Sequence, residues 1–110
     1  MKRKIHNKLI RDNIPEIIKK DKAIPKTFIL NDKQFALALK KKLVEEAKKL
    51  LKAKTQEEIL DELSDVLQLV ESIAQNNQMT IKKIEKQKEV KKIKKGGFEK
   101  RIFLKWVDKL

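Results

Sequence analysis

The sequence contains no cysteine, and this absence excludes two kinds of structure. Without thiols the chain can form neither a disulfide framework nor a thiolate metal site, and a chain without disulfides suits a reducing compartment. The only histidine, His6, has no second histidine or cysteine with which to build a transition-metal site. We therefore assign His6 a surface or packing role and no function.

Glycine and long apolar runs are also scarce. The only glycines, Gly96 and Gly97, are adjacent, so the chain has no glycine-rich loop of the kind that binds phosphate. No stretch reaches the roughly 18 apolar residues of a membrane-spanning helix, and the basic first residues are not followed by the apolar segment of a signal peptide. These absences predict a cytoplasmic protein.

Positive charge is abundant, but it comes almost entirely from lysine. The formal net charge is +13, and arginine occurs only at Arg3, Arg11 and Arg101. A basic chain can bind nucleic acid by neutralising phosphates, yet base and phosphate recognition draws heavily on the arginine fork. The composition therefore makes nucleic acid an unfavoured partner, while it still favours the attraction of nucleotide polyphosphates.

The length of 110 residues suits one domain, and the composition favours helices with one apolar stripe. Hydrophobic residues make up 40% and charged residues 41% of the chain, which leaves each helix a heavily solvated face. We predict a single domain over residues 1–110, an all-α helical bundle built on an antiparallel helix pair. Strong apolar stripes on at least two helices also predict a homo-oligomer, a dimer or higher, because one subunit covers them only partly.

The N-terminal third is predicted to be mostly irregular. Pro15 suits the first turn of a short helix that ends at about Asp21. Residues 24–30 favour a short extended piece, which Pro25 interrupts. This part of the chain should therefore add little regular structure to the bundle.

Two long helices follow, with a turn predicted near Lys54. The first should run from about residue 31 to 53, with the good capping residues Asn31 and Asp32 at its start. Its apolar stripe comprises Ala36, Leu39, Leu43, Ala47, Leu50 and Leu51. Thr55 and Glu58 form a capping box for the second helix. The buried face of that helix is predicted to comprise Ile59, Leu60, Leu63, Val66, Leu67, Val70, Ile73 and Ala74.

A third helix and a tail complete the predicted structure. Asn76 and Asn77 interrupt the pattern, Thr80 can cap a helix to about Lys95, and the adjacent glycines end it. The tail FEKRIFLKWVDKL holds most of the aromatic residues, so we expect it to pack on the bundle, with Trp106 as a core or interface anchor.

Acidic residues are concentrated around the predicted turn. Between residues 45 and 65 the chain places Glu45, Glu46, Glu57, Glu58, Asp61, Glu62 and Asp65. At about 100° per residue, Glu62 and Asp65 lie beside the apolar stripe of their helix, and Glu46 flanks the stripe of the preceding one. Glu46 precedes Lys54 by eight residues and Glu62 follows it by eight, so the two should stand at the same level of a hairpin.

Such convergence of Glu46, Glu62 and Asp65 has two interpretations. Adjacent carboxylates repel by roughly 1 to 4 kcal/mol per close pair, and a hard cation would relieve that repulsion. Magnesium binds through a few carboxylates together with substrate phosphates, which is the chemistry of a triphosphate-cleaving site. Alternatively, the acids form a solvated face that pairs with neighbouring lysines.

Four segments together resemble a known family. NKLIRDNIPEII from Asn7, the pair Glu45 and Glu46, the ExxD from Glu62 to Asp65 and GGFEKRIFL from Gly96 are similar to the MazG-like (all-α) nucleoside triphosphate pyrophosphohydrolases. They resemble the phosphoribosyl-ATP pyrophosphohydrolase-like branch in particular. The resemblance covers almost the whole chain. It implies a helical bundle that is dimeric or higher, and Mg2+-dependent hydrolysis of a nucleoside triphosphate to the monophosphate and pyrophosphate, for the removal of unwanted nucleotides.

The resemblance also assigns roles to individual residues. It implies that Glu46, Glu62 and Asp65 are metal ligands, that Glu45 is a catalytic helper that orients water or another ligand, and that Arg101 binds substrate phosphate. For Arg11 and Asp12 of the N-terminal motif we favour a structural ion pair over contact with substrate from a neighbouring subunit.

The chain departs from the family pattern at Lys49. The EExxE pattern ends in a glutamate that is usually a ligand, and an ammonium group cannot coordinate magnesium. Two alternatives to an active enzyme therefore stay open: a nucleotide-binding relative with impaired catalysis, and a basic helical protein associated with nucleic acid.

Overall fold

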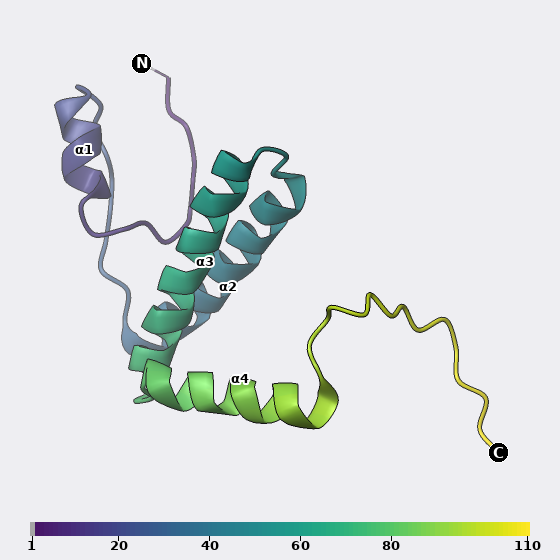
Figure 1. Ribbon diagram of the computed structural model, residues 1–110. Coiled ribbons are helices and arrows are strands. Elements are labelled where there is room, and N and C mark those ends of the chain that lie inside the picture. The colour runs from purple at the N-terminus through teal and green to yellow at the C-terminus, as the bar shows by residue number, and fades with distance from the viewer. Residues whose placement is uncertain (1) are drawn as a thin grey trace. The chain divides into compact units, whose positions relative to one another are not determined.

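The computed structural model describes residues 2–110 and is all-helical, as predicted (Figure 1). Within these residues the helices are α1 (Ile14–Lys20), α2 (Asp32–Lys52), α3 (Gln56–Asn76) and α4 (Ile81–Lys95), and there is no strand. None of these helices is both long and apolar enough to cross a membrane. The chain divides into two compact units, one that ends at Gln78 and one from Met79 to Leu110. The single domain over residues 1–110 stays a prediction.

Both helices of the central pair begin at the predicted caps. The Asn31 side chain accepts the backbone N–H of Gln34 at 2.8 Å, and the Gln34 side chain accepts the N–H of Asn31 at 3.0 Å. Thr55 caps α3 by accepting the N–H of Glu58 at 3.1 Å. The reciprocal contact differs from a capping box, because the Glu58 carboxylate accepts the Thr55 hydroxyl instead of its backbone N–H. Each such cap contributes roughly 1 kcal/mol.

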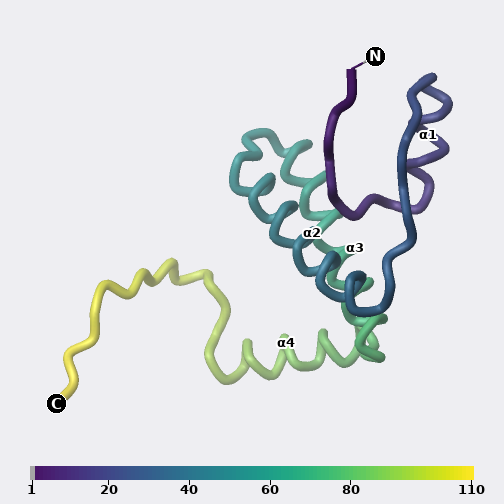
Figure 2. Tube along the Cα trace, turned by 180° about the vertical axis from the view of Figure 1, so that it is seen from behind, coloured from purple at the N-terminus to yellow at the C-terminus, as the bar shows by residue number. Residues whose placement is uncertain are grey.

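The α2 and α3 helices form an antiparallel hairpin, which both views show (Figures 1 and 2). Among the described residues the buried hydrophobic side chains are Leu39, Leu69 and Ala74. Leu39 lies early in α2 and the other two lie late in α3, so this small core occupies the end of the hairpin away from its turn. Glu46 is also buried, between the core and the turn.

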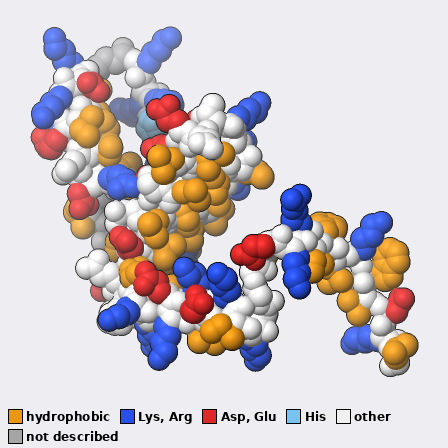
Figure 3. Space-filling view, in the orientation of Figure 1, with side chains coloured by type: hydrophobic (Ala, Val, Ile, Leu, Met, Phe, Trp, Pro, Cys, Tyr) orange, Lys and Arg blue, Asp and Glu red, His pale blue; other side chains and the backbone are white. Residues whose placement is uncertain are grey.

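The predicted apolar stripes are only partly buried. Leu51 is 87% exposed, Leu60 69% and Leu67 58%. In the space-filling view, hydrophobic side chains gather over the hairpin (Figure 3). The predicted burial of Leu60 and Leu67 is wrong within the hairpin, because α2 and α3 each cover only part of the other's stripe.

The N-terminal segment runs beside the hairpin before it enters α1 (Figures 1 and 2). Asn7 takes a left-handed backbone conformation with φ 45°, and the N–H of Ile14 bonds to the carbonyl of Arg11 at 3.1 Å as the chain turns into α1. Pro15 lies in the first turn of α1, as predicted. Residues 24–30 form no helix or strand.

The second unit contains α4 and the C-terminal tail. Thr80 caps α4 by accepting the N–H of Lys83 at 3.1 Å, and the helix ends at Gly96, whose φ of 85° favours glycine. In the tail, the side chains of Phe98 and Trp106 are 96% and 70% exposed. Within this unit these aromatic residues are therefore exposed, and their packing on the bundle stays a prediction. A lysine-rich helix without a distinct apolar stripe gives them no hydrophobic surface of its own.

Candidate metal-binding site

Three predicted ligands converge on the hairpin. Glu46 of α2 and the pair Glu62 and Asp65 of α3 each offer one carboxylate oxygen, and these oxygens all lie within 4.8 Å of one another. Glu62 and Asp65 share a face because they are one helical turn apart. The equal spacing of Glu46 and Glu62 about the turn brings the two helices' carboxylates to the same level, as the sequence predicts.

Two oxygens in this group have no partner. The Glu46 side chain is 4% exposed, and Oε2 of Glu46 and Oε2 of Glu62 are buried atoms without a hydrogen bond. Burial without a partner is costly for a charged oxygen. Two ionised carboxylates cannot satisfy each other's oxygens, since neither has a proton with which to donate a hydrogen bond. Either a proton shared between them or a cation would satisfy both oxygens.

The titration of the pair reflects this competition. Competition for a proton with the neighbouring Glu46 carboxylate, together with desolvation and the nearby negative charges, raises the pKa of Glu62 to about 7. Burial alone would raise the pKa of Glu46, but a proton shared with Glu62 and the charge of Lys49 outweigh it and lower that pKa. Without a cation, the pair therefore retains a proton until the pH rises through about 7.

Two lysines of α2 border the carboxylates. Lys49 Nζ lies 3.4 Å from Oε1 of Glu46 and 3.7 Å from Oε1 of Glu45. Lys42 Nζ lies 3.5 Å from Oε1 of Glu46 and 3.4 Å from Oε1 of Glu45. Burial alone would lower the pKa of Lys49, but Glu46, Glu45 and Glu62 outweigh it and raise it. Lys49 therefore stays charged, and both lysines contact Oε1 of Glu46 and leave Oε2 unpartnered.

The N-terminal segment adds two further cations. Arg11 Nη2 donates to Oδ1 of Asp65 at 2.7 Å, and Lys8 Nζ lies 3.5 Å from Oε1 of Glu45. The ion pair of Arg11 is thus made with α3 of the same chain. The sequence did not indicate this partner, because 54 residues separate the two side chains. Lys42, which we did not predict either, could have been found from its i,i+4 spacing to Glu46.

The residues present fit a hard divalent cation. All three donors are carboxylates, the ligand type that magnesium and calcium prefer. The span of 4.8 Å is compatible with oxygens around one ion at roughly 2.0–2.6 Å each. The unpartnered oxygens of Glu46 and Glu62 are the specific observation in favour of a ligand, while the charge of Lys49 opposes a cation.

Two other predicted site residues lie outside this group. Glu45 is adjacent to it but contacts Lys42, Lys8 and Lys49, whose charges outweigh the effect of burial and lower its pKa. A carboxylate of that kind can hold a water molecule by accepting a hydrogen bond, but it is a weak proton acceptor. Arg101 belongs to the second unit, and its role at the site stays a prediction.

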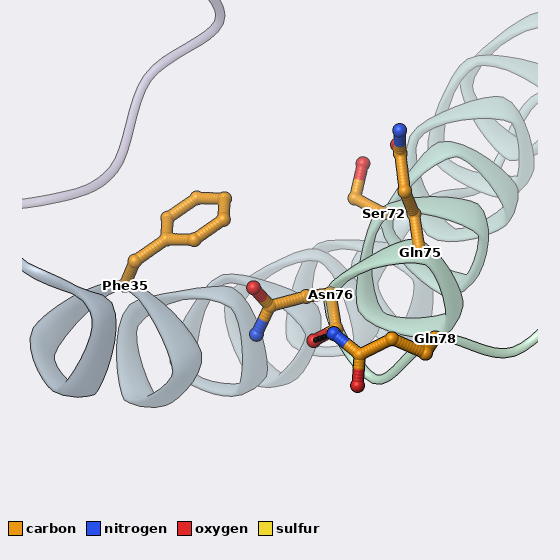
Figure 4. Close-up of a pocket in the computed structure, with 5 residues that line it drawn as sticks. All are labelled: Phe35, Ser72, Gln75, Asn76 and Gln78. Carbon is orange, nitrogen blue, oxygen red and sulfur yellow. Dashed lines mark hydrogen bonds between the residues drawn. The ribbon is translucent and has the colours of Figure 1, made fainter.

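The hairpin also carries a pocket at the end away from its turn. It has a volume of about 320 Å³ and is lined by Phe35, Ser72, Gln75, Asn76 and Gln78 (Figure 4). Its lining contains neutral amides, one hydroxyl and one aromatic ring. Without a charged side chain, it offers neither a metal ligand nor a counterion for phosphate.

Comparisons with protein-family models, with curated proteins and with solved structures find no match to this chain.

Proposed function

We propose that the protein is a Mg2+-dependent nucleoside triphosphate pyrophosphohydrolase of the MazG-like kind. The observation that supports the proposal is the convergence of Glu46, Glu62 and Asp65, with two buried carboxylate oxygens that lack partners. The same three residues are the ligands that the resemblance implies. Removal of unwanted nucleotides from the cytoplasmic pool would be the corresponding role.

The proposed reaction requires few groups from the protein. A water oxygen bonds to the α-phosphorus, the bond from that phosphorus to the bridging oxygen breaks, and pyrophosphate leaves with the electron pair. A bound cation would supply charge neutralisation on the phosphates. Glu46, Glu62 and Asp65 would hold that cation, and Glu45 would orient the water molecule, whose proton passes to solvent.

A second candidate function is nucleotide binding without efficient hydrolysis. It is favoured by Lys49, whose ammonium lies 3.4 Å from Glu46 where the family pattern has a carboxylate. A positive charge there weakens cation binding, and catalysis depends on the cation more steeply than nucleotide binding does. Both functions would use the same residues.

A screen for pyrophosphate release tests the proposal. The full chain is incubated with a panel of nucleoside triphosphates and Mg2+, with EDTA as the metal-free control. We expect release that EDTA and Glu46→Gln abolish, whereas Glu71→Gln, which neutralises an exposed carboxylate elsewhere on α3, retains it.

Other outcomes of this screen would favour the alternatives. Nucleotide binding without release would support the impaired relative. Salt-sensitive binding of duplex DNA without any preference for nucleotides would support the nucleic-acid-associated protein and would contradict the proposal.

A further inference from the structure

Arg11 reaches the carboxylate group from outside the hairpin. Its Nη2 donates to Oδ1 of Asp65 at 2.7 Å, and its backbone carbonyl accepts the N–H of Ile14 at 3.1 Å where α1 begins. Among residues 2–110, the contact with Asp65 is the one hydrogen bond of its side chain. Since a guanidinium has five N–H donors and this side chain is 57% exposed, several donors face solvent beside the site.

Asp65 is therefore shared between two roles. It supplies one of the three oxygens that lie within 4.8 Å of each other, and it is also the counterion of Arg11. A cation bound at those oxygens would compete with Arg11 for the charge of Asp65. Arg11 would then be a guanidinium without a counterion at the rim of a cation site.

We propose that Arg11 is a phosphate-binding residue of this site, held by Asp65 in the cation-free chain and transferred to a substrate phosphate when a cation occupies the carboxylates. The identity of the ligand as a nucleotide rests on the proposed function, but the recognition of a polyphosphate by Arg11 does not.

The neighbouring cations are less suited to this role. Lys42 is 17% exposed and is held between Glu45 and Glu46. Lys49 contacts the same two carboxylates from within α2. Arg11 is more exposed, extends from a segment outside the hairpin, and has a planar fork that matches two phosphate oxygens at once.

The first experiment measures two affinities by calorimetry on the full chain: Mn2+ alone, and inorganic tripolyphosphate in saturating Mn2+. In Arg11→Ala, Mn2+ alone should bind more tightly, because its competitor for Asp65 is gone. Tripolyphosphate should bind about tenfold more weakly, because a charge-assisted hydrogen bond is lost. Arg11→Lys should recover part of the tripolyphosphate affinity.

The matched control is Lys19→Ala. It removes the same charge from an exposed ion pair with Glu16 in α1, away from the carboxylate group, and should change neither affinity. Circular dichroism checks that the exposed replacements keep the helices. If Arg11 had a structural role alone, Arg11→Ala would not weaken tripolyphosphate binding and at the same time tighten Mn2+ binding. An unchanged tripolyphosphate affinity in Arg11→Ala therefore overturns the proposal.

A metal-free arm separates this proposal from the enzymatic one. In EDTA, Asp65→Asn releases Arg11 from its counterion, so tripolyphosphate should bind more tightly than to the parent. Adding Arg11→Ala to Asp65→Asn should remove most of that gain, whereas adding Lys19→Ala should not. If Arg11→Ala leaves the gain intact, Arg11 does not bind phosphate.

The two proposals can therefore fail separately. If no nucleoside triphosphate yields pyrophosphate but the tripolyphosphate results hold, the proposed enzymatic function fails and the assignment of Arg11 stands.

Discussion

Replacement of Lys49 by glutamate should strengthen cation binding. Lys49 Nζ lies 3.4 Å from Oε1 of Glu46, and its side chain is 48% exposed. At that separation one unit charge pair interacts by roughly 1 to 5 kcal/mol for effective dielectrics of about 80 to 20, and the exposure favours the lower end. Lys49→Glu changes the local charge by two units, so a gain of roughly 2 kcal/mol, or about thirtyfold in affinity for Mg2+, is expected.

The same replacement should destabilise the cation-free protein. It removes the ion pairs of Lys49 with Glu46 and Glu45 and adds a negative charge beside both. The melting temperature should therefore fall in EDTA and should recover more strongly than that of the parent when Mg2+ is added, because ligand binding stabilises the folded state. The distinctive outcome is that Lys49→Glu lowers the melting temperature in EDTA and increases the rise in melting temperature that Mg2+ produces.

Calorimetry with Mg2+, thermal unfolding with and without Mg2+, and pyrophosphate release are the three measurements. Lys48→Glu is the matched control, because it makes the same charge change one residue away, about 100° around the helix. If Lys49→Glu binds Mg2+ no more tightly than Lys48→Glu does, the electrostatic reasoning is refuted. Lys49 would then have no influence on the site.

Three further outcomes are expected. Because the folded-state pKa of Glu62 is raised from 4.5 to about 7, its stabilising contribution is complete below pH 4.5 and is lost as the pH rises through about 7. The melting temperature in EDTA should therefore fall between about pH 5 and 8, and Glu62→Gln should reduce that fall; an unchanged slope would contradict the shared proton. The exposed apolar side chains of the hairpin should support self-association, measured by light scattering at tens of micromolar, and Leu60→Gln should weaken it; a monomeric parent would contradict this. Asn31→Ala should cost about 1 kcal/mol of unfolding free energy in urea, and no loss would mean that the capping box is not stabilising.

The features that the sequence predicted correctly depend on local rules. Thr55 and Asn31 identify the starts of the two long helices because a side-chain oxygen can accept the N–H three residues on. The convergence of Glu46 and Glu62 follows from equal spacing about a short turn, once the two helices are antiparallel. Neither inference required knowledge of any third element.

The features that the sequence did not predict depend on the path of the chain. The pairing of Arg11 with Asp65 crosses 54 residues and requires the N-terminal segment to run beside the hairpin, which no local pattern specifies. The exposure of Leu51 and Leu60 depends on how many neighbours the hairpin has, and periodicity describes only which residues share a face. Sequence periodicity alone cannot distinguish a stripe buried within one chain from a stripe available to a partner.

Three kinds of positive charge can compensate the carboxylates, and they act on different atoms. A proton shared between Glu46 and Glu62 would satisfy oxygens that lack partners, but it is lost as the pH rises through about 7. Lys49 contacts Oε1 of Glu46, so it lowers the negative charge without occupying the oxygens that lack partners. Lys49 should therefore weaken cation binding without blocking it.

A weakened carboxylate site gains most from phosphate oxygens that coordinate the same ion, and magnesium is commonly bound by a few carboxylates together with substrate phosphates. Coupling between two binding sites is reciprocal. A polyphosphate that raises the affinity of the site for the cation is therefore itself bound more tightly when the cation is present. At the proposed site, Lys49 would thus favour arrival of the cation together with its polyphosphate over a permanently loaded site.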